Sequence, residues 1–303
     1  MFWAQGWSDL RSQKEKYAAD HACVQAWKQL YPPGGSESGW KLRLLDDDDA
    51  KALSPRYAEV RNHSNSGRLA LATASDLLRL DLLSRYGGVW TDTSVCPFQR
   101  LESWLPEALA AREGLFFPWA FKWKLESYPA AHLPHSELGR FKNCQYASDN
   151  AKWSRPLETF FLAAAKPHDP MIDAWADALN PRLLEVLARP THEPYPYYIV
   201  HCSMTLARLR DASVDERWQR IRASVAGHGL PRIMGTARRI CGCMRNHDNP
   251  GVSSPACEGS YAESHCYWVK KAESKAYQAY LSSPRYREYV RGLGSNLRAP
   301  SLT

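Results

Sequence analysis

The sequence predicts an α/β protein in which a mixed, mostly parallel sheet is flanked by helices. Its 303 residues are enough for one large domain of this class. The shares of hydrophobic residues, 44%, and of charged residues, 23%, are typical of a folded globular protein. The first 45 residues give the order strand, helix, strand, which defines a βαβ unit and implies a parallel sheet.

The opening βαβ unit is predicted from three segments. Residues 2–7 form a short apolar segment with a glycine near its end, which is typical of a buried strand. Apolar residues then recur at helical spacing from 9 to 31, and Pro-Pro-Gly-Gly at 32–35 is a strong stop signal. Residues 41–45 are the second strand, closed by the aspartates at 46–49.

A second helix and strand follow in the most informative part of the chain. Thr73 and Asp76 have the spacing of a capping box, so we expect the helix to begin there, and Gly87 is its expected end. Residues 88–91 are a short strand with Asp92 at its carboxyl end. Ligands of open α/β sheets collect outside the carboxyl ends of the strands, so Asp92 is placed where a site is expected.

The remaining chain gives weaker signals and no domain boundary, repeat or low-complexity tract. We expect strands at 114–117 and 159–164, helices at 170–187, 202–209 and 270–293, and loops at 132–149 and 245–264.

Charge and aromatic content leave several partners open. The net charge is +7, and nine arginines lie between Arg208 and Arg245. Such a region attracts nucleic acid, an anionic polymer or a phosphorylated donor, but it is equally typical of a solvated helical face. The 12 tryptophans and 15 tyrosines suit stacking on sugars or bases, and they also suit a large aromatic core.

The eight cysteines do not form a zinc motif. Free thiols are the first interpretation, disulfides in an oxidising compartment the second and zinc the last. Four are scattered and four are close together in the sequence: Cys23, Cys96, Cys144 and Cys202, then Cys241, Cys243, Cys257 and Cys266.

No apolar run approaches the roughly 20 residues of a membrane span, and the start of the chain lacks the features of a signal peptide. We therefore expect a cytoplasmic protein without a membrane span, or a truncated form of a membrane-anchored one.

Asp76, Arg79 and Asp92 are the candidate functional residues. Asp76 and Arg79 are three residues apart on one helix face, and an arginine offers several donors to phosphates or hydroxyl groups. A carboxylate on a tight turn, such as Asp92, suits Mg²⁺, which typically takes one or two carboxylates and completes its shell with phosphate oxygens and water. The alternative is a local ion pair on a surface helix and an ordinary aspartate in a turn.

The run from Ala74 to Val95 resembles a known family. Ala74-Ser75-Asp76-Leu77-Leu78-Arg79, Arg85-Tyr86-Gly87-Gly88-Val89-Trp90 and Asp92-Thr93-Ser94-Val95 are similar to the S-D-x-x-R…Y-G-G-x-[WY]-x-D core of the capsular polysaccharide synthesis family. That family is similar to the glycosyltransferases of family GT32 and, more distantly, to the large clostridial glucosylating toxins. The segments at 3–7, 160–164 and 167–171 extend the resemblance over most of residues 1–175.

The resemblance implies a single GT-A-like (Rossmann-like) domain spanning residues 1–303. Residues 1–100 would be the nucleotide-sugar-binding half, and residues 101–303 the acceptor side and C-terminal helical part. The implied activity is transfer of a sugar from a nucleotide-sugar donor to a glycan or polysaccharide acceptor, assisted by Mn²⁺ or Mg²⁺.

Several site residues are implied by the same resemblance. Asp92 and Arg79 would be catalytic; Asp76, Arg79, Trp90, Trp3 and Gln5 would bind the donor; and Asp92, Ser94 and His265 would bind the metal. Ser94 replaces the second acid of a D-x-D element, although a hydroxyl can also ligate Mg²⁺. Near His265, Ser264, Trp268, Lys270 and Lys271 are candidates for closing over the diphosphate.

Two roles have only loose candidates. A catalytic base is not identified by the motif, and Asp149, Glu158 and Asp169 are possible. Aromatic candidates for the acceptor side are Trp119, Trp153, Tyr195 and Tyr197.

Two other functions fit parts of the sequence. A donor-binding pseudoenzyme would explain Ser94, and a basic nucleic-acid-binding protein would explain the charge. No RNP-type motif, zinc-finger spacing or helix-turn-helix signature supports the second, so we expect no nucleic acid partner.

Overall fold

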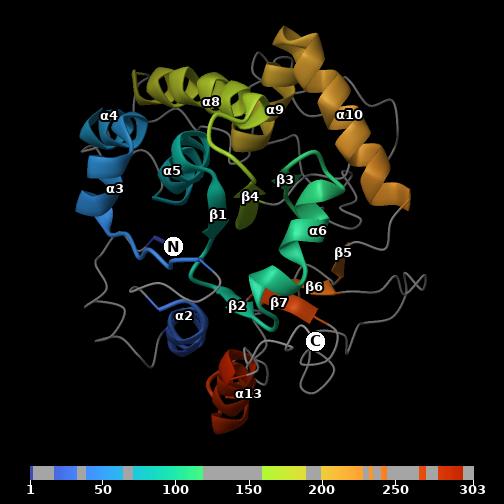
Figure 1. Ribbon diagram of the computed structural model, residues 1–303. Helices are drawn as coiled ribbons and strands as arrows, with labels where there is room; N and C mark the ends of the chain where they lie inside the picture. The colour runs from blue at the N-terminus through green and yellow to red at the C-terminus, as the bar shows by residue number, and fades with distance from the viewer. Residues whose placement is uncertain are drawn as a thin grey trace, which may run out of the picture. The chain divides into compact units, whose positions relative to one another are not determined.

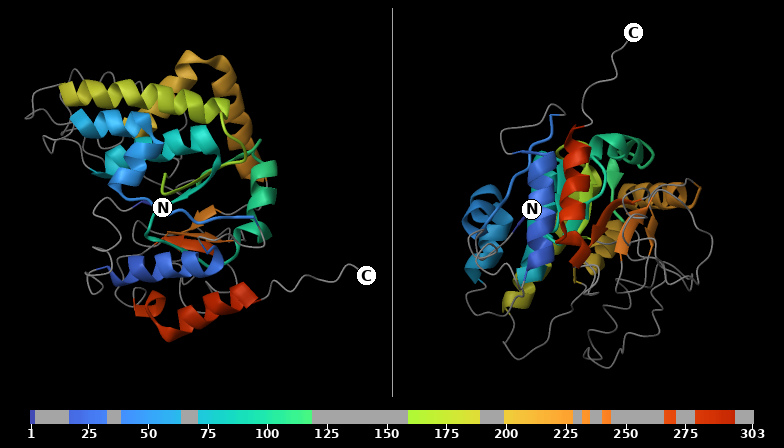
Figure 2. Two further views of the ribbon diagram at one scale, coloured as in Figure 1. Left: turned by 60° about the vertical axis from the view of Figure 1, so that its left-hand side comes forward. Right: turned by 90° about the horizontal axis from the view of Figure 1, so that it is seen from below.

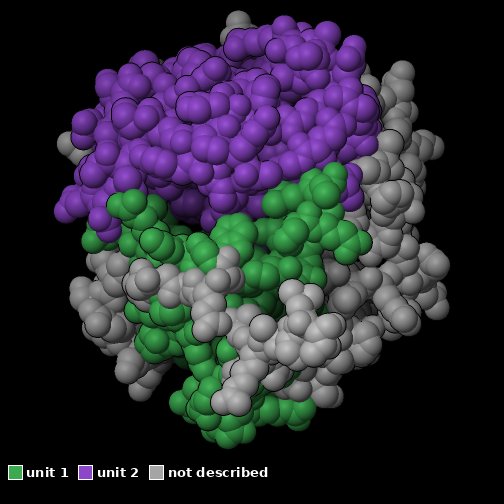
Figure 3. Space-filling view, in the orientation of Figure 1, with its two compact units in different colours: residues 1–47, 91–110, 228–303 green, residues 48–90, 111–227 purple. Residues whose placement is uncertain are grey.

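A computed structural model describes the chain in two compact units (Figure 3). Unit 1 contains Met1–Asp47, Thr91–Ala110 and His228–Thr303, and unit 2 contains Asp48–Trp90 and Ala111–Gly227. The described residues are 1–2, 17–32, 39–63, 71–118, 159–188, 199–227, 232–234, 240–243, 266–270 and 279–295.

Unit 1 contains a four-stranded sheet and two helices that lie side by side. The strand order is β2-β7-β6-β5, and each neighbouring pair is antiparallel. The helices are α2 (Ala18–Leu30) and α13 (Pro284–Ser295), seen in blue and red in Figures 1 and 2. The other elements are β2 (Val95–Pro97), η2 (Leu101–Ser103), α6 (Leu105–Ala110), β5 (Arg232–Met234), β6 (Ile240–Cys243) and β7 (Cys266–Lys270).

Strand β2 holds α2 in place. The buried face of α2 includes Cys23 and Trp27. The Trp27 indole Nε1 donates to the Val95 carbonyl at 2.7 Å, and Cys23 forms a disulfide with Cys96. A cross-link and a buried hydrogen bond therefore join one face of α2 to two successive residues of β2.

Helix α13 is also attached to the end of β2. The Tyr286 hydroxyl donates to the Pro97 carbonyl at 2.7 Å, and the Tyr289 hydroxyl donates to the Phe98 carbonyl at 2.7 Å. Both rings contact the buried Phe98 ring, with centroids 5.2 and 5.9 Å away. A tyrosine that buries its ring while its hydroxyl finds a carbonyl gains apolar burial without leaving a polar group unpaired.

Unit 2 is mainly helical, with α8 packed against α4, α5, α9 and α10 (Figure 1). The order of its three-stranded sheet is β1-β4-β3, and β3 pairs with β4 in the antiparallel direction. The elements are α3 (Asp47–Leu53), α4 (Pro55–His63), α5 (Leu71–Tyr86), β1 (Gly88–Thr91), β3 (Leu115–Phe116), β4 (Phe161–Ala164), α8 (Pro170–Ala188), α9 (Ile199–Arg210) and α10 (Ala212–Gly227).

Helix α5 ends because Gly87 leaves the helical conformation. Gly87 has a φ of +64°, and its N–H donates to the Leu83 carbonyl at 2.9 Å. A Cβ at this position would lie 2.8 Å from the Lys166 carbonyl carbon. Glycine is required here both for the positive φ and for the close approach of the 164–167 backbone.

A buried carboxylate fixes α5 to the segment before α4. Asp81, 1% exposed, accepts a hydrogen bond of 2.7 Å from the Ser54 hydroxyl. It also pairs with Arg56 and Arg85, at 3.4 and 3.1 Å. Buried charge is stable only when paired, and these three partners meet that condition.

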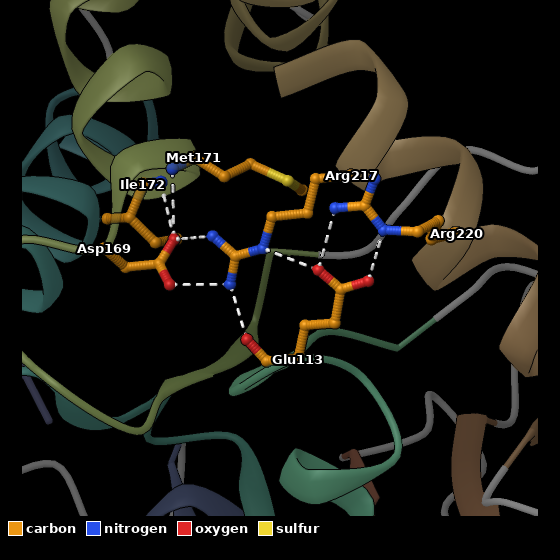
Figure 4. A network of polar contacts seen from close by, with 6 residues as sticks. All are labelled: Glu113, Asp169, Met171, Ile172, Arg217 and Arg220. Atoms are coloured by element: carbon orange, nitrogen blue, oxygen red, sulfur yellow. Dashed lines mark hydrogen bonds and ion pairs between the residues drawn. The ribbon is translucent and has the colours of Figure 1, made fainter. Parts of the chain in front are cut away.

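Helix α10 is anchored by the network in Figure 4. Arg217 donates to both oxygens of Asp169, at 2.8 and 2.7 Å, and to the Glu113 carbonyl at 2.6 Å. Arg220 reaches both oxygens of the Glu113 carboxylate, at 2.6 and 3.1 Å. Hydrogen bonding from Arg220 lowers the pKa of the Glu113 carboxyl below its usual range. Asp169 also accepts the N–H groups of Met171 and Ile172, so it caps α8.

The described structure confirms several predicted elements. The predicted helices at 73–86, 170–187 and 202–209 are α5, α8 and α9, and the predicted strand at 88–91 is β1. The predicted strands at 114–117 and 159–164 are present in shorter form as β3 and β4, and within the helix predicted at 9–31, α2 covers Ala18–Leu30.

The prediction of a mostly parallel sheet is not met. The described pairs with a defined register are antiparallel, apart from one parallel bridge between Phe2 and Leu45. Residues 41–45 do not form a strand beyond this bridge, and the aspartates at 46–49 lead into α3 instead of a loop.

Two details of helix boundaries are also corrected. Helix α5 begins at or before Leu71, so Thr73 is a buried helical residue and Asp76 lies in the second turn, away from any cap. The expected 270–293 helix is replaced by β7, which ends at Lys270, and by α13, which begins at Pro284. At β7, pairing with β2 and β6 overrides the local helical signal.

Candidate functional site

The predicted residues Asp76, Arg79 and Trp90 lie together in unit 2. The Arg79 Nη2 atom is 3.1 Å from Asp76 Oδ1, and the Arg79 guanidinium lies over the Trp90 ring, 5.3 Å from its centroid. Helix α5 supplies the first two residues one turn apart, and β1, which follows Gly87, supplies the third. A cation above a tryptophan face is an attractive arrangement, so Arg79 links the carboxylate to the ring.

Arg79 is itself almost fully buried and closely bonded. It is 4% exposed, and it donates to the Ser75 carbonyl at 3.2 Å and the Ser75 hydroxyl at 2.9 Å. Its Nη1 donates to the Thr159 carbonyl. With Asp76, these contacts use most of the five N–H donors of a guanidinium. Arg79 is therefore placed to orient its neighbours.

Asp76 is the more accessible member of the cluster. Its side chain is 15% exposed, three times the value for Arg79 at 5%. The Thr159 hydroxyl donates to Asp76 Oδ1 at 3.2 Å, so Oδ1 is held from two sides. A carboxylate fixed in this way and still reached by solvent can accept hydrogen bonds from the hydroxyl groups of a ligand.

Asp92 and Ser94 form a turn in unit 1. The Val95 N–H donates to the Asp92 carbonyl at 3.0 Å, which closes the turn between β1 and β2. Thr91 and Thr93 are buried, while Asp92 and Ser94 are partly exposed. The alternation points the acid and the hydroxyl of Ser94 away from the core, as a ligand-binding turn requires.

The start of the chain lies near Asp92. The Met1 amino group donates to the Arg43 carbonyl at 3.1 Å. Burial lowers the pKa of this amino group to about 5, and the negative charge of Asp92 acts in the opposite direction. Asp92 is therefore within electrostatic reach of the first residue.

Strand β7 brings Lys270 beside the turn. In the β2–β7 register, Val95 is opposite Lys270 and Pro97 is opposite Trp268. Cys266 begins β7, four residues from Lys270 and about 13 Å away at the usual strand rise. The backbone of Lys270 therefore lies next to the Asp92–Ser94 turn. In the sequence, His265 precedes Cys266, the residue at the other end of β7.

The Asp92–Ser94 turn offers a divalent cation one carboxylate and one hydroxyl group. In the described residues, no group of three histidine, cysteine, aspartate or glutamate side chains is arranged to hold a metal ion. One partly exposed carboxylate with a hydroxyl two residues away fits Mg²⁺ or Mn²⁺ only when phosphate oxygens and water complete the shell. Asp92 and Ser94 therefore fit a metal that arrives with an anionic ligand.

Several predicted residues lie outside the described part of the chain. They are Trp3, Gln5, Ser264, His265 and Lys271, the acids Asp149 and Glu158, and the aromatic residues Trp119, Trp153, Tyr195 and Tyr197. The third candidate base, Asp169, is described, and it is 1% exposed with both oxygens bonded to Arg217. Asp169 therefore has a structural role.

The free-thiol interpretation is wrong for three cysteines. Cys23 and Cys96 form a disulfide in which both residues are 0% exposed, and Cys202 is also disulfide-bonded. Cys23 and Cys96 are 73 residues apart, so their pairing could not be deduced from spacing.

Sequence reasoning missed two residues that support the cluster. Ser75 is part of the quoted motif, but its double contact with Arg79 depends on the helix geometry. Thr159 is 83 residues from Asp76 and has no sequence signal. A contact of this range comes only from the pairing of β1 with β4.

Comparison with known protein families gives one match. The family model described as capsular polysaccharide synthesis protein matches residues 1–228, so the chain belongs to this family. The match includes the Asp76 cluster and the Asp92 turn, and it ends before β5, β6, β7 and α13. Searches of curated proteins and of solved structures found no significant match. Within the described residues, no helix is both long and apolar enough to cross a membrane.

Proposed function

We propose that this member of the capsular polysaccharide synthesis protein family is a glycosyltransferase of the GT-A type, which moves a sugar from a nucleotide-sugar donor to a glycan or polysaccharide acceptor. The observation that carries the proposal is the buried Arg79, which joins a partly exposed carboxylate, Asp76, to the ring of Trp90. Side chains that are held in place before any ligand binds are typical of a preorganised binding site.

Asp76 and Trp90 would bind the donor. The Asp76 carboxylate accepts hydrogen bonds from sugar hydroxyl groups, because Arg79 and Thr159 hold it in one orientation. Trp90 is 4% exposed, so its ring would line the nucleotide side from within the protein, beneath the Arg79 guanidinium. Arg79 is a positioning residue in this proposal, since most of its donors already bond to the protein.

Asp92 and Ser94 would hold Mg²⁺ or Mn²⁺ together with the donor diphosphate. When bound, the cation neutralises the negative charge that grows on the departing diphosphate. The closed turn keeps the two side chains in place, and the buried Thr91 and Thr93 on either side limit its movement.

A GT-A-like arrangement is supported by the first residues of unit 1. The isolated parallel bridge between Phe2 and Leu45 pairs one residue before α2 with one residue after it, as the two strands of a βαβ unit pair on either side of their helix. Asp92 then directly follows β1, as a ligand-binding acid does in open α/β sheets.

Donor binding and transfer should be measured separately. UDP-, GDP-, CMP- and dTDP-linked sugars with Mn²⁺ or Mg²⁺ are screened by thermal shift, because a ligand of the native state raises the melting temperature. The transfer assay then uses the donor that binds. We expect Asp76→Asn to weaken donor binding tenfold or more and Asp92→Asn to abolish the metal enhancement. The matched control is Asp48→Asn, an exposed aspartate of α3.

The outcomes separate this proposal from its alternatives. If Asp76→Asn, Asp92→Asn and the control Asp48→Asn changed donor binding and its metal enhancement equally, the assignment of the site would be wrong. Donor binding without transfer at any metal concentration would favour the pseudoenzyme, for which Ser94 is the supporting feature. Salt-sensitive binding of DNA or RNA, with no nucleotide sugar bound, would favour a nucleic-acid-binding protein.

A further inference from the structure

A groove lies between α2 and α13 in unit 1. Its volume is about 550 Å³, within the usual range for ligand sites. The α2 wall includes three alanines spaced four residues apart, Ala18, Ala22 and Ala26, and these small side chains leave room between the helices. The floor includes Tyr286, which is buried and bonded to the Pro97 carbonyl.

The groove carries positive charge on both walls. Lys28 extends from α2, and Arg287 and Arg291, one turn apart, extend from α13. Among the residues that the structure describes, none of the three has an ion-pair partner, and no acid lines the groove. Gln25 and Gln29 add amide groups on the same side of α2.

Both walls are fixed to the strand that follows the Asp92–Ser94 turn. Helix α2 is held by the Cys23–Cys96 disulfide and by Trp27, and α13 is held by Tyr286 and Tyr289. These contacts reach four successive residues, from Val95 to Phe98. The groove is therefore a built feature of unit 1, because neither helix can shift without breaking buried bonds to β2.

We propose that this groove binds an acidic polysaccharide, through carboxylate or similar anionic groups on the glycan. Arginine presents a rigid fork that matches such groups, and the two glutamines suit the neighbouring sugar hydroxyls. The inference rests on the proposed function, since it assigns an anionic acceptor or product to the same enzyme. Helix α13 lies beyond the residues matched by the family, so the family description does not assign this site.

An extended glycan fits the groove better than a flat anionic surface does. The cations line two walls of a concavity, whereas a membrane surface requires them on one outward face. The described lining residues contain no exposed tryptophan, tyrosine or phenylalanine, since Tyr286 is buried, and the His21 imidazole is the one partly exposed ring for stacking nucleic acid bases.

The test is a binding titration without any nucleotide sugar. Fluorescent oligogalacturonate and dextran sulfate are the acidic probes, and methyl-esterified oligogalacturonate and dextran are the neutral ones. We expect the acidic glycans to bind, with affinity that falls as salt rises. Arg287→Glu/Arg291→Glu should weaken binding at least tenfold, and Arg287→Lys/Arg291→Lys should retain most of it.

The matched control is Arg210→Glu/Arg285→Glu, which changes net charge equally at two exposed arginines outside the groove. An equal loss in both double variants would mean that only net charge matters, and would overturn the proposal. Failure of both acidic glycans to bind would also overturn the proposal. Binding of single-stranded DNA or phosphatidylglycerol vesicles through Arg287 and Arg291, without binding of the glycans, would overturn it as well.

The same titration distinguishes this inference from the proposed function. Asp92→Asn should bind the acidic glycans as tightly as the wild type, because the turn does not line the groove. Glycan binding without sugar transfer would contradict the proposed glycosyltransferase activity and support the glycan site in the groove. Sugar transfer without binding of acidic glycans would contradict the glycan site in the groove and support the proposed glycosyltransferase activity.

Discussion

Removing the Cys23–Cys96 disulfide should destabilise the protein by about 4 kcal/mol. The bond closes a loop of 73 residues. The loss of loop-closure entropy in the unfolded chain is roughly 2.1 + 1.5R ln n, or about 15 cal/mol/K, which gives about 4 kcal/mol at 25 °C. This is a large part of the roughly 5–15 kcal/mol that stabilises a typical domain.

The perturbation is Cys23→Ala/Cys96→Ala, compared with the oxidised wild type by urea denaturation. We expect the free energy of unfolding to fall by about 4 kcal/mol, with a smaller further loss from two buried truncations. Metal-enhanced donor binding should weaken as well, because Cys96 lies two residues after Ser94. A difference below about 1 kcal/mol would refute the reasoning and mean that the unfolded chain is already constrained.

Three further changes test single contacts by thermal or urea denaturation. Burial lowers the pKa of the Arg112 guanidinium from its usual value to about 10, which at 1.36 kcal/mol per pKa unit costs about 3 kcal/mol at neutral pH. The unfolded state binds this proton more tightly, so the cost is full below pH 10 and decreases as the pH rises above 10. Arg112→Met should therefore raise the free energy of unfolding by about 1–3 kcal/mol, and a loss would show that the contacts with Phe116 and the Phe117 carbonyl outweigh burial. Gly87→Ala should cost about 2 kcal/mol or more, from its positive φ and the 2.8 Å contact, and an unchanged melting temperature would contradict the described turn. Arg79→Lys should lower the melting temperature and donor affinity together, since a lysine cannot make the same set of contacts; lost affinity with full stability would instead make Arg79 a direct donor ligand.

The disulfide also affects the predicted compartment. Disulfides form and persist in oxidising environments and are rare in the reducing cytosol of mesophiles. The cytoplasmic location expected from the absence of an apolar run stays a prediction, and the Cys23–Cys96 bond counts against it. Mass spectrometry of thiols alkylated in the intact cell would decide between the two.

Local sequence signals were enough to predict α5 and β1, but they were not enough to predict how the strands pair in the sheets. Helix α5, its end at Gly87 and strand β1 could be predicted because their periodicity and stop residue lie within 20 residues. Residues 41–44 alternate in exposure, with Lys41 and Arg43 exposed, yet the residue that forms the bridge is the buried Leu45, which breaks the alternation. Whether an alternating segment becomes a strand depends on a partner elsewhere in the chain, which its own sequence does not specify.

The arginine-rich region illustrates the same limit. Its charge suggested either an anion-binding surface or a solvated face, but Arg217 is bonded to residues 104 and 48 positions away, Glu113 and Asp169. The unpaired cations that the structure does describe on a concave surface are Lys28, Arg287 and Arg291, and all three lie outside that region.

The candidate site was predicted in its members but not in its organisation. The motif brings Asp76, Arg79 and Trp90 together by sequence, and it suggests that Arg79 should reach a ligand. The fold instead buries Arg79 and uses Thr159, from the segment before β4, to complete its contacts. A residue that is required to hold a ligand-binding carboxylate is under the same constraint as one that touches the ligand, so a sequence motif cannot distinguish the two roles. Only the exposure of Asp76 relative to Arg79 distinguishes them, and this exposure is why we propose that the carboxylate contacts the donor.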